Sequence, residues 1–175
     1  MIAVKNNPDI VIRRAHQRDV AAVVQLFDDA IAWFVRIGNV GQWGSEPWSA
    51  SPQRIERIAR ECALPEAWVA EKSSIGVCGA MVLGDAMPYV QPACQAELYV
   101  RMLIASRDKE ARGSGRKLLE FADERAKAVG VNQLRVDCYG GGSGDLVRFY
   151  EACGYQPVTT FDVDGWPGQL LSRAI

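Results

Sequence analysis

The sequence predicts an α+β fold with a mixed sheet and helices on both of its faces. Two observations lead to this prediction. Four stretches repeat apolar residues at steps of three and four, the spacing of helices that bury one face. Between them lie short runs rich in Val, Ile and aromatic residues, bounded by Gly, Pro or Asp, which is typical of strands. The resulting order is β-α-α-β-β-β-α-β-α-β-β, without a repeat.

The first half of the chain predicts a strand, two helices and a hairpin. Asp19 opens a helix whose apolar side chains keep helical spacing until the chain reaches Gly38. Pro52, at a favourable first helical position, starts a second helix that ends before Pro65. Short β-rich runs predict the strands of this half at 10–14, 68–70 and 77–83.

The second half predicts four strands and two helices. The apolar run 98–105 reads as a strand, and helical spacing begins after Gly115 and continues to Val129. Asp145 starts a short helix that Gly154 ends at a position favouring left-handed backbone. The remaining strands are predicted at 133–138, at 158–163, and around 170–171 after a tight turn at 164–165.

Composition limits the protein's class. The 175 residues are 49% hydrophobic with a net charge of −1, which favours a single domain over 1–175 with 1–8 as a loosely ordered tail. The near-zero charge disfavours nucleic acid and anionic membranes as partners. The N-terminus lacks the apolar core of a signal peptide, and no run approaches the ~18 apolar residues of a spanning helix. We therefore expect a cytoplasmic protein that does not bind membranes.

The cysteines and the sole histidine suggest no metal and no disulfide framework. The five cysteines are widely spaced and contain no C-x-x-C pair, so we expect reduced, mostly buried thiols and no metal site. A single histidine also disfavours His-based nucleophilic catalysis. These residues are Cys62, Cys78, Cys94, Cys138, Cys153 and His16.

A glycine-bearing turn between a predicted strand and helix, at residues 110–119, has the features of an anion site. The first amides of a helix lack intrahelical partners, and the helix dipole places partial positive charge there. Glycines allow the main chain to approach a ligand, and nearby basic side chains add charge, so a phosphate or pyrophosphate is the expected ligand. The residues concerned are Gly113 and Gly115 with Arg112, Arg116 and Lys117.

Two common nucleotide-binding loops do not fit this turn. A phosphate loop of the form G-x-x-x-x-G-K-[ST] would need a hydroxyl for magnesium that the residues after Gly115 do not supply. A dinucleotide fingerprint, G-x-G-x-x-G, fails because Leu118 occupies the place of the third glycine. Without further context, the glycines could also merely shape the turn.

The turn resembles the [QR]-x-x-G-x-[GA] motif with which the GNAT superfamily of N-acetyltransferases holds acetyl-CoA. Residues 110–115 match both glycine positions and depart at the first, where Glu110 replaces Gln or Arg; we expect Glu110 to turn outward. Residues 99–119 resemble the superfamily's fourth strand, pyrophosphate loop and third helix. Residues 134–155 resemble the next strand and helix, ending close to F-Y-x-x-x-G-[FY].

This resemblance implies a three-layer fold with a mostly antiparallel sheet of about six to seven strands, and acetyl-CoA as co-substrate. Tyr150 would protonate the leaving thiolate; a phenol of pKa near 10 can serve a thiol of about 8.5. Tyr150 could also be a core residue. Ser143 stands where many members carry asparagine, and its glycine-rich loop could be only a flexible lead-in to the helix. The implied cofactor-binding residues are Leu103, Ile104, Ala105, Ala111, Arg112, Gly113, Ser114, Gly115, Arg116 and Ser143.

The acceptor amine must lose a proton, and superfamily members often use a strand carboxylate or water for this. Glu97, at the start of the central strand, is the first candidate, ahead of Glu46 and Asp85; a solvated strand-end carboxylate is the alternative. An aromatic and acidic wall would suit an organic amine, although the same tryptophans could instead close the core. The candidate acceptor-binding residues are Trp43, Glu46, Trp48 and Trp166.

These features together predict an acetyl-CoA-dependent N-acetyltransferase in which a small-molecule primary amine attacks the thioester directly. Two alternatives remain open. A non-catalytic acyl-CoA-binding sensor or interaction module of the same fold would bind the cofactor without turnover. A small nucleotide- or phosphate-handling transferase would depend on ATP or magnesium. A homodimer is common in the superfamily and is a further expectation.

Overall fold

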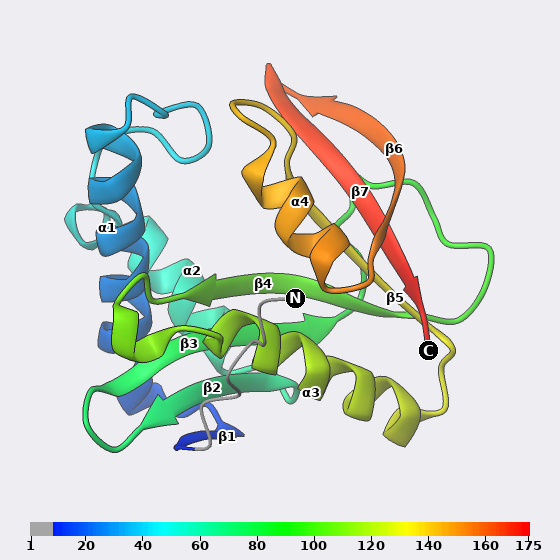
Figure 1. Ribbon diagram of the computed structural model, residues 1–175, viewed down its shortest axis with the longest axis horizontal. Coiled ribbons are helices and arrows are strands. Elements are labelled where there is room, and N and C mark those ends of the chain that lie inside the picture. The colour runs from blue at the N-terminus through cyan, green and yellow to red at the C-terminus, as the bar shows by residue number, and fades with distance from the viewer. Residues whose placement is uncertain (1–8) are drawn as a thin grey trace, which may run out of the picture. The chain divides into compact units, whose positions relative to one another are not determined.

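The computed structural model describes residues 9–175, so the tail expected at 1–8 lies outside the described residues. Seven strands form a sheet in the order β1-β2-β3-β4-β5-β7-β6 (Figure 1). The strands are β1 Ile10–Arg14, β2 Ala67–Lys72, β3 Gly76–Gly84, β4 Leu98–Ala105, β5 Gln133–Tyr139, β6 Gln156–Val163 and β7 Trp166–Ala174. The α-helices are α1 Val20–Arg36, α2 Pro52–Cys62, α3 Ser114–Val129 and α4 Asp145–Ala152.

The predicted order of strands and helices is confirmed, and so is the mixed, mostly antiparallel sheet. Strand β5 runs parallel to β4. The pairs β1–β2, β2–β3, β5–β7 and β6–β7 are antiparallel. This arrangement, with the order of its helices, is an α+β fold.

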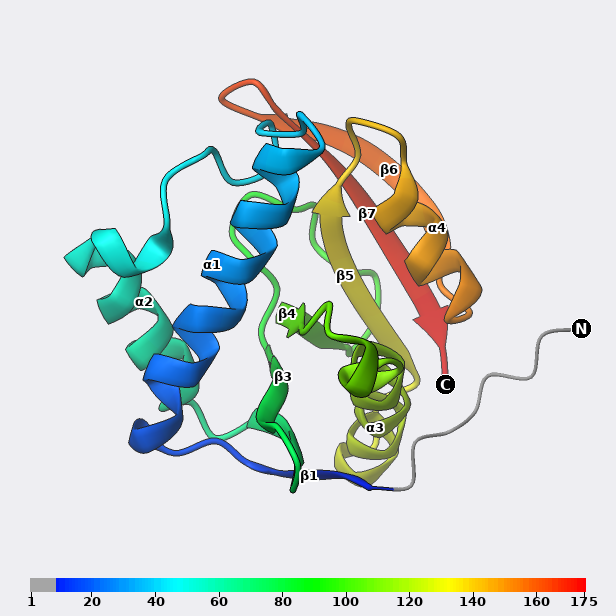
Figure 2. The same ribbon diagram turned by 60° about the vertical axis from the view of Figure 1, so that its left-hand side comes forward.

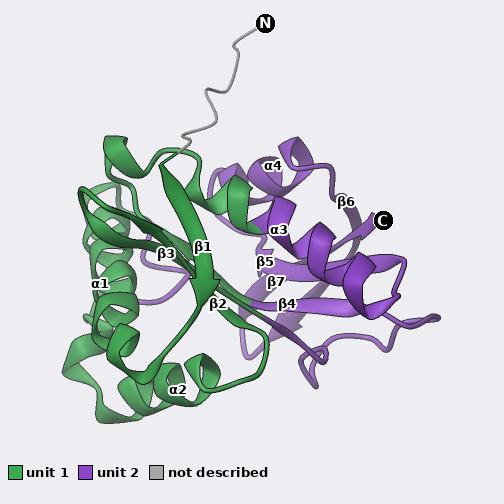
Figure 3. Cartoon of the chain, turned by 90° about the horizontal axis from the view of Figure 1, so that it is seen from below, with its two compact units in different colours: residues 1–38, 45–82, 102–118 green, residues 39–44, 83–101, 119–175 purple. Residues whose placement is uncertain are grey.

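Contacts divide the chain into two compact units, which are described separately (Figure 3). Unit 1 comprises residues 1–38, 45–82 and 102–118, and unit 2 comprises residues 39–44, 83–101 and 119–175. Strands β3 and β4 and helix α3 each run from one unit into the other. The single domain expected over 1–175 stays a prediction.

In unit 1, α1 and α2 lie on one face of β1–β3 and the start of α3 lies on the other (Figure 2). The stripe predicted for α1 is buried, with Val23, Phe27 and Ile31 at successive helical turns. Helix α2 begins at Pro52. Ser51 caps it, because its hydroxyl accepts a hydrogen bond from the backbone N–H of Arg54. Apolar periodicity and a capping serine thus determine these two helices.

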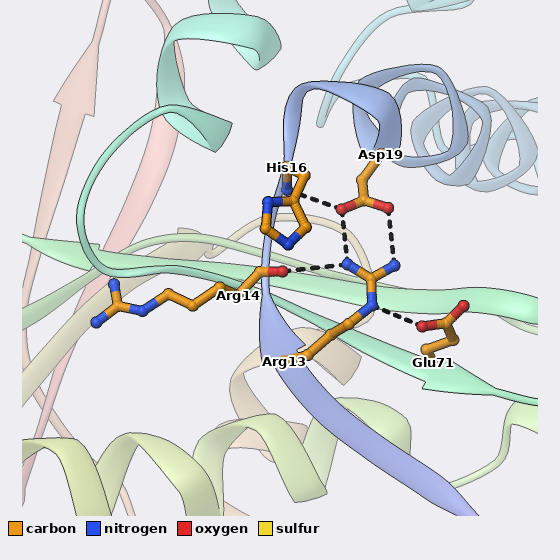
Figure 4. Close-up of polar contacts among 5 residues, drawn as sticks. All are labelled: Arg13, Arg14, His16, Asp19 and Glu71. Carbon is orange, nitrogen blue, oxygen red and sulfur yellow. Dashed lines mark hydrogen bonds and ion pairs between the residues drawn. The ribbon is translucent and has the colours of Figure 1, made fainter.

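A polar cluster ties the end of β1 to the start of α1 and to β2 (Figure 4). The Arg13 guanidinium donates to both carboxylate oxygens of Asp19, at 2.8 and 2.9 Å, and to Glu71 at 2.6 Å. Asp19 also accepts from the backbone N–H of His16 at 2.8 Å. The hydrogen bonds from Arg13 lower the pKa of the buried Asp19 carboxyl, and the two carboxylates raise the pKa of Arg13.

We predict that Asp19→Asn destabilises the protein by about 2–3 kcal/mol, because it leaves Arg13 with a weakened partner. The folded pKa of Asp19 lies below the unfolded value of about 3.9. Its contribution is therefore complete above about pH 4 and is lost as the pH falls through the folded pKa. Urea unfolding at pH 7 and below pH 4 measures both effects, and the difference between the variant and the unaltered protein should shrink in acid.

Glu56→Gln is the matched control for this prediction. Glu56 pairs with Arg60 one turn along α2, but both side chains are more than two thirds exposed. Exposed pairs of this kind contribute little, so the change should stay within about 0.5 kcal/mol. An Asp19→Asn variant as stable as the Glu56→Gln variant would contradict the role given to the cluster.

In unit 2, strand β7 lies between β5 and β6. The β6–β7 hairpin turns at Asp164 and Gly165, as predicted, and φ is positive at both, 50° and 86°. This is the signature of a type I′ turn, whose twist matches that of the strands. The last strand contains Leu170 and Leu171 as predicted but is not short, because the tight turn pairs Val163 with Trp166 and β7 begins there.

No helix within residues 9–175 has the length and apolarity needed to cross a membrane. Across the same residues, no group of three His, Cys, Asp or Glu side chains could hold a metal ion. All five cysteines fall in this part of the chain and are free, with Cys94 exposed and the other four buried. The expected burial of most of the thiols is thus observed, and their reduced state stays a prediction.

Candidate functional site

The loop before α3 turns sharply into the helix. A single 3₁₀ turn, Lys109–Ala111, uses the amides of Ala111 and Arg112, which donate to the carbonyls of Asp108 and Lys109 at 3.1 and 3.3 Å. Gly113 follows with φ of +93°, a conformation that favours glycine. A Cβ at this glycine would meet no atom within 4 Å, so the space beside it is open.

The first turn of α3 leaves amide groups directed out of its N-terminus. The amide of Lys117 donates to the carbonyl of Gly113 at 2.9 Å. Ser114 and Gly115 precede Lys117 in the helix. Their amides have no acceptor within α3, because the carbonyls four residues earlier lie before the helix begins. The anion-binding amides expected from Ala111 to Arg116 are thus fewer, because those of Ala111 and Arg112 are already bonded.

Side chains of this loop fasten it to the strands of unit 1. The buried Ser114 hydroxyl donates to the carbonyl of Cys78 at 3.2 Å. The Lys117 ammonium donates to the carbonyl of Ile10, so its expected role as a charge for the anion is not supported. These contacts hold the loop in place and leave Arg112, which is exposed, and Arg116, which is half-buried, as the basic side chains of the turn.

Glu110, the departure from the family motif, lies against the β2–β3 turn. Its carboxylate accepts from the Ser74 hydroxyl at 3.1 Å, and its carbonyl accepts from the Lys72 ammonium at 3.2 Å. The residue is exposed. The expected outward orientation of Glu110 is therefore observed, with a partner in β2–β3 that explains it.

The end of β4 presents its main-chain groups alternately to two edges. The amide of Ser106 donates to the Cys78 carbonyl at 2.9 Å, and the Ile104 carbonyl lies 3.3 Å from where a Cβ of Gly79 would be. Residues 104 and 106 thus face β3. Because neighbouring residues in a strand direct their N–H and C=O groups to opposite edges, Leu103 and Ala105 face away from β3. Three residues were expected to bond pantetheine through their main chain. Leu103 and Ala105 are the two whose main-chain groups do not point toward β3.

Tyr150 lies in unit 2 on α4, with 4% of its surface exposed. Its ring makes edge contacts with Phe149 and Tyr155, at centroid distances of 5.3 and 5.7 Å. Burial, with smaller contributions from neighbours such as Cys138, raises the pKa of Tyr150 well above its usual value. The phenol therefore keeps its proton at neutral pH, which suits an acid and equally suits a core tyrosine.

Ser143 is exposed in the loop before α4, and its hydroxyl donates to a carboxylate oxygen of Asp145. The other oxygen of that carboxylate accepts from Arg148. A contact of Ser143 with the cofactor stays a prediction, and its hydroxyl hydrogen already has a partner.

Glu97, the first candidate for the general base, is held in an ion pair. Both of its oxygens accept from the Arg135 guanidinium, through Nε and, at 2.7 Å, through Nη2. Arg135 is only 3% exposed and also donates to the Gln91 carbonyl at 2.9 Å. A proton on Glu97 would leave this buried guanidinium with a neutral partner, which is costly. The geometry therefore disfavours Glu97 as a base.

Asp137, a carboxylate that the sequence analysis did not single out, lies on β5 two residues after Arg135. Asp137 accepts hydrogen bonds from the hydroxyls of Tyr99 and, at 3.2 Å, Tyr89. Burial raises its pKa although both hydrogen bonds act to lower it. The available signal was the alternation of Arg135, Asp137 and Tyr139 with buried apolar residues in β5, because polar side chains on one face of an inner strand require partners.

The predicted acceptor-binding residues do not share one environment. Trp48 is buried in unit 1 and stacks on Phe27, with ring centroids 4.1 Å apart. It therefore serves the core there, which is the alternative left open above. Glu46 is exposed. In unit 2, Trp166 donates from its ring nitrogen to the Gln42 carbonyl at 3.0 Å, which brings the segment containing Trp43 to the start of β7.

Comparison of the fold with solved structures identifies similar proteins. A protein provisionally assigned as a phosphinothricin N-acetyltransferase is 22% identical, with a TM-score of 0.66 over 95% of this chain and 98% of that chain. A GNAT-family acetyltransferase of Listeria monocytogenes is 19% identical, with a TM-score of 0.64 over 95% of each chain. The yncA protein of Salmonella typhimurium, provisionally described as an acetyltransferase and solved with acetyl-CoA, is 16% identical, with a TM-score of 0.65 over 95% and 94%.

These likenesses show that the chain has the fold of the GNAT acetyltransferases. No protein-family model matches the sequence, and no curated protein matches it significantly. The resemblance drawn from residues 99–119 and 134–155 is thus supported by the tertiary structure.

Proposed function

We propose that the protein is an acetyl-CoA-dependent N-acetyltransferase that acetylates the primary amine of a small molecule. The observation that carries this proposal is the loop at Gly113. A glycine with positive φ, open space where a side chain would be, and amides directed out of a helix N-terminus form a cradle for a pyrophosphate. A fold shared with acetyltransferases, one of them solved with acetyl-CoA, supports the choice of ligand.

The residues present fit acetyl-CoA at two places. Amides of Gly113, Ser114 and Gly115, with the side chains of Arg112 and Arg116, would bind the pyrophosphate. Main-chain groups of Leu103 and Ala105, which face away from β3, would pair with the pantetheine arm as an added strand does.

The chemistry is a direct transfer. The acceptor nitrogen attacks the thioester carbon, the bond to sulfur breaks, and the developing thiolate takes a proton from the Tyr150 hydroxyl. The raised pKa of Tyr150 keeps that proton in place until the thiolate forms. Main-chain N–H groups would stabilise the oxyanion of the tetrahedral intermediate.

The test combines binding with turnover. Isothermal titration should show acetyl-CoA binding to one site per chain. Incubation with acetyl-CoA and tyramine, 1,4-diaminobutane or kanamycin, with free CoA measured by chromatography, should show release that depends on the amine. Chromatography is preferable to a thiol reagent, because Cys94 is exposed and would react. Absence of binding would refute the proposal, and binding without release for any amine would favour the sensor.

A further inference from the structure

The Asp137 carboxylate is half-buried and has no basic partner within residues 9–175. Its two hydrogen-bond partners are the hydroxyls of Tyr99 and Tyr89, both neutral donors. In the described part of the chain, no lysine or arginine pairs with it. An ionised carboxylate removed from water is costly unless a cation accompanies it. The carboxylate of Asp137 can therefore accept a cation from a ligand.

Arg135, the buried arginine on the same strand, does not pair with Asp137. Arg135 lies on the same face of β5, with its guanidinium 5.9 Å from the centre of the Tyr99 ring. Both oxygens of Glu97 are bonded to it, so its charge is already balanced. The ion pair instead supports Tyr99, which pairs in register with Arg135 across β4 and β5. The Asp137 carboxylate is thus fixed in position but not neutralised.

One side of Asp137 faces the surface. Tyr99 is fully buried and bonds one carboxylate oxygen, whereas Tyr89 is 43% exposed and bonds the other. A ligand approaching from the Tyr89 side can reach the second oxygen without displacing the core contacts of Tyr99. An ammonium group, with three donors and a positive charge, matches that oxygen.

A row of aromatic rings extends from this point across the strands of unit 2. The centroid distances are 5.7 Å from Tyr89 to Phe161, 6.3 Å from Phe161 to Trp166 and 5.8 Å from Trp166 to Tyr139. We name these four residues the aromatic row. All are exposed or half-buried, so each offers ring surface to a ligand. Ring faces attract cations and bury apolar groups.

We propose that Asp137 binds the ammonium group of the acceptor and takes its proton, while the aromatic row holds the rest of the molecule. The acceptor class is accordingly a small primary amine with an aromatic or apolar body and no carboxylate. This inference rests on the proposed function, since it describes the second substrate of the same reaction. It assigns the base to a residue of β5 rather than to Glu97.

Two protons leave the acceptor nitrogen during the transfer. The ammonium gives one proton to Asp137, which passes it to water beside the exposed Tyr89. The neutral nitrogen then bonds the acetyl carbon, and the tetrahedral intermediate collapses as its bond to sulfur breaks. Nitrogen loses its second proton, which replaces the one that Tyr150 gives to the thiolate. One proton is released overall, with an amide and a free thiol as products.

The first experiment is Asp137→Asn, with tyramine as the acceptor. We expect acetyl-CoA affinity to change less than about twofold and kcat/KM for tyramine to fall by roughly 100-fold or more, the usual loss for a general base. Because the substitution removes a half-buried carboxylate that no cation balances, the melting temperature of the amine-free variant should not fall. Asp164→Asn, at the exposed β6–β7 turn, is the matched control and should retain full activity.

A second comparison tests the acceptor class. The unaltered protein should acetylate tyramine with a higher kcat/KM than 1,4-diaminobutane, and glutamate should be a poor acceptor because its carboxylates are repelled by Asp137. Trp166→Leu should raise KM for tyramine more than for 1,4-diaminobutane.

The outcomes separate this inference from the proposed function. If the protein does not bind acetyl-CoA, the proposed function fails. If it binds and turns over acetyl-CoA while Asp137→Asn remains fully active, or if glutamate is preferred to tyramine, only the inference about Asp137 is overturned. A variant whose melting temperature falls would show instead that the carboxylate serves the fold.

Discussion

Replacing Gly113 with glutamate should weaken acetyl-CoA binding strongly. The new side chain would enter the open space beside the loop and place a carboxylate where the pyrophosphate is proposed to lie. Like charges a few ångströms apart near a protein surface repel by about 3 kcal/mol, which weakens binding by roughly 100-fold. Isothermal titration of the purified variant measures the effect, and turnover should fall in parallel at sub-saturating acetyl-CoA.

The matched control is Gly130→Glu at the other end of α3. Gly130 has a similar positive φ, +76°, and a Cβ there would also meet nothing within 4 Å. It follows the helix as a C-terminal cap, so its substitution carries a comparable backbone strain without adding charge at the N-terminus. Equal losses of acetyl-CoA affinity in the two variants would mean that strain, not the anion site, explains the effect at Gly113.

Tyr150→Phe should lower kcat by about 100-fold or more and leave acetyl-CoA affinity nearly unchanged. The substitution removes a hydroxyl and keeps the ring that contacts Phe149 and Tyr155. Loss of a positioned general acid typically costs 10²–10⁴-fold in rate. Steady-state kinetics with tyramine and titration with acetyl-CoA measure the two quantities separately. Loss of affinity together with rate would favour the interpretation of Tyr150 as a core residue.

Tyr155→Phe provides the comparison for this effect. Tyr155 belongs to the same buried ring cluster, and its hydroxyl has no hydrogen-bond partner among residues 9–175. Removing an unbonded buried hydroxyl should leave kcat unchanged and stability equal or slightly higher. If Tyr155→Phe slowed turnover as much as Tyr150→Phe, a specific acid role for Tyr150 would be untenable.

Local patterns in the sequence were sufficient for most of the fold. The buried face of α1, the start of α2 at Pro52 and the turn at Asp164–Gly165 depend on residues close together in the chain, and each lies where it was predicted. The loop at Gly113 belongs to the same class, because its positive φ and helix start are local properties. The extent of β7 was missed because the register with β6, not composition, determines where it begins.

The hydrogen-bond and ion-pair partners of the polar side chains could not be predicted in the same way. Glu97 and Arg135 are 38 residues apart, and so are Tyr99 and Asp137. Whether a carboxylate is paired with a cation or only with neutral hydroxyls depends on which strands lie side by side. That is why Glu97 looked available in the sequence and Asp137 was overlooked.

The sequence by itself thus determined the order of the elements, the glycine-bearing turn before α3 and the resemblance to acetyltransferases, since helical spacing, glycine positions and caps act over a few residues. The tertiary structure decided which side chains are used elsewhere: Lys117 bonds β1, and Trp48 joins the core of unit 1. It also decided which charge is left unbalanced, at Asp137. Burial and pairing depend on distant segments meeting, so they become visible only in the folded chain.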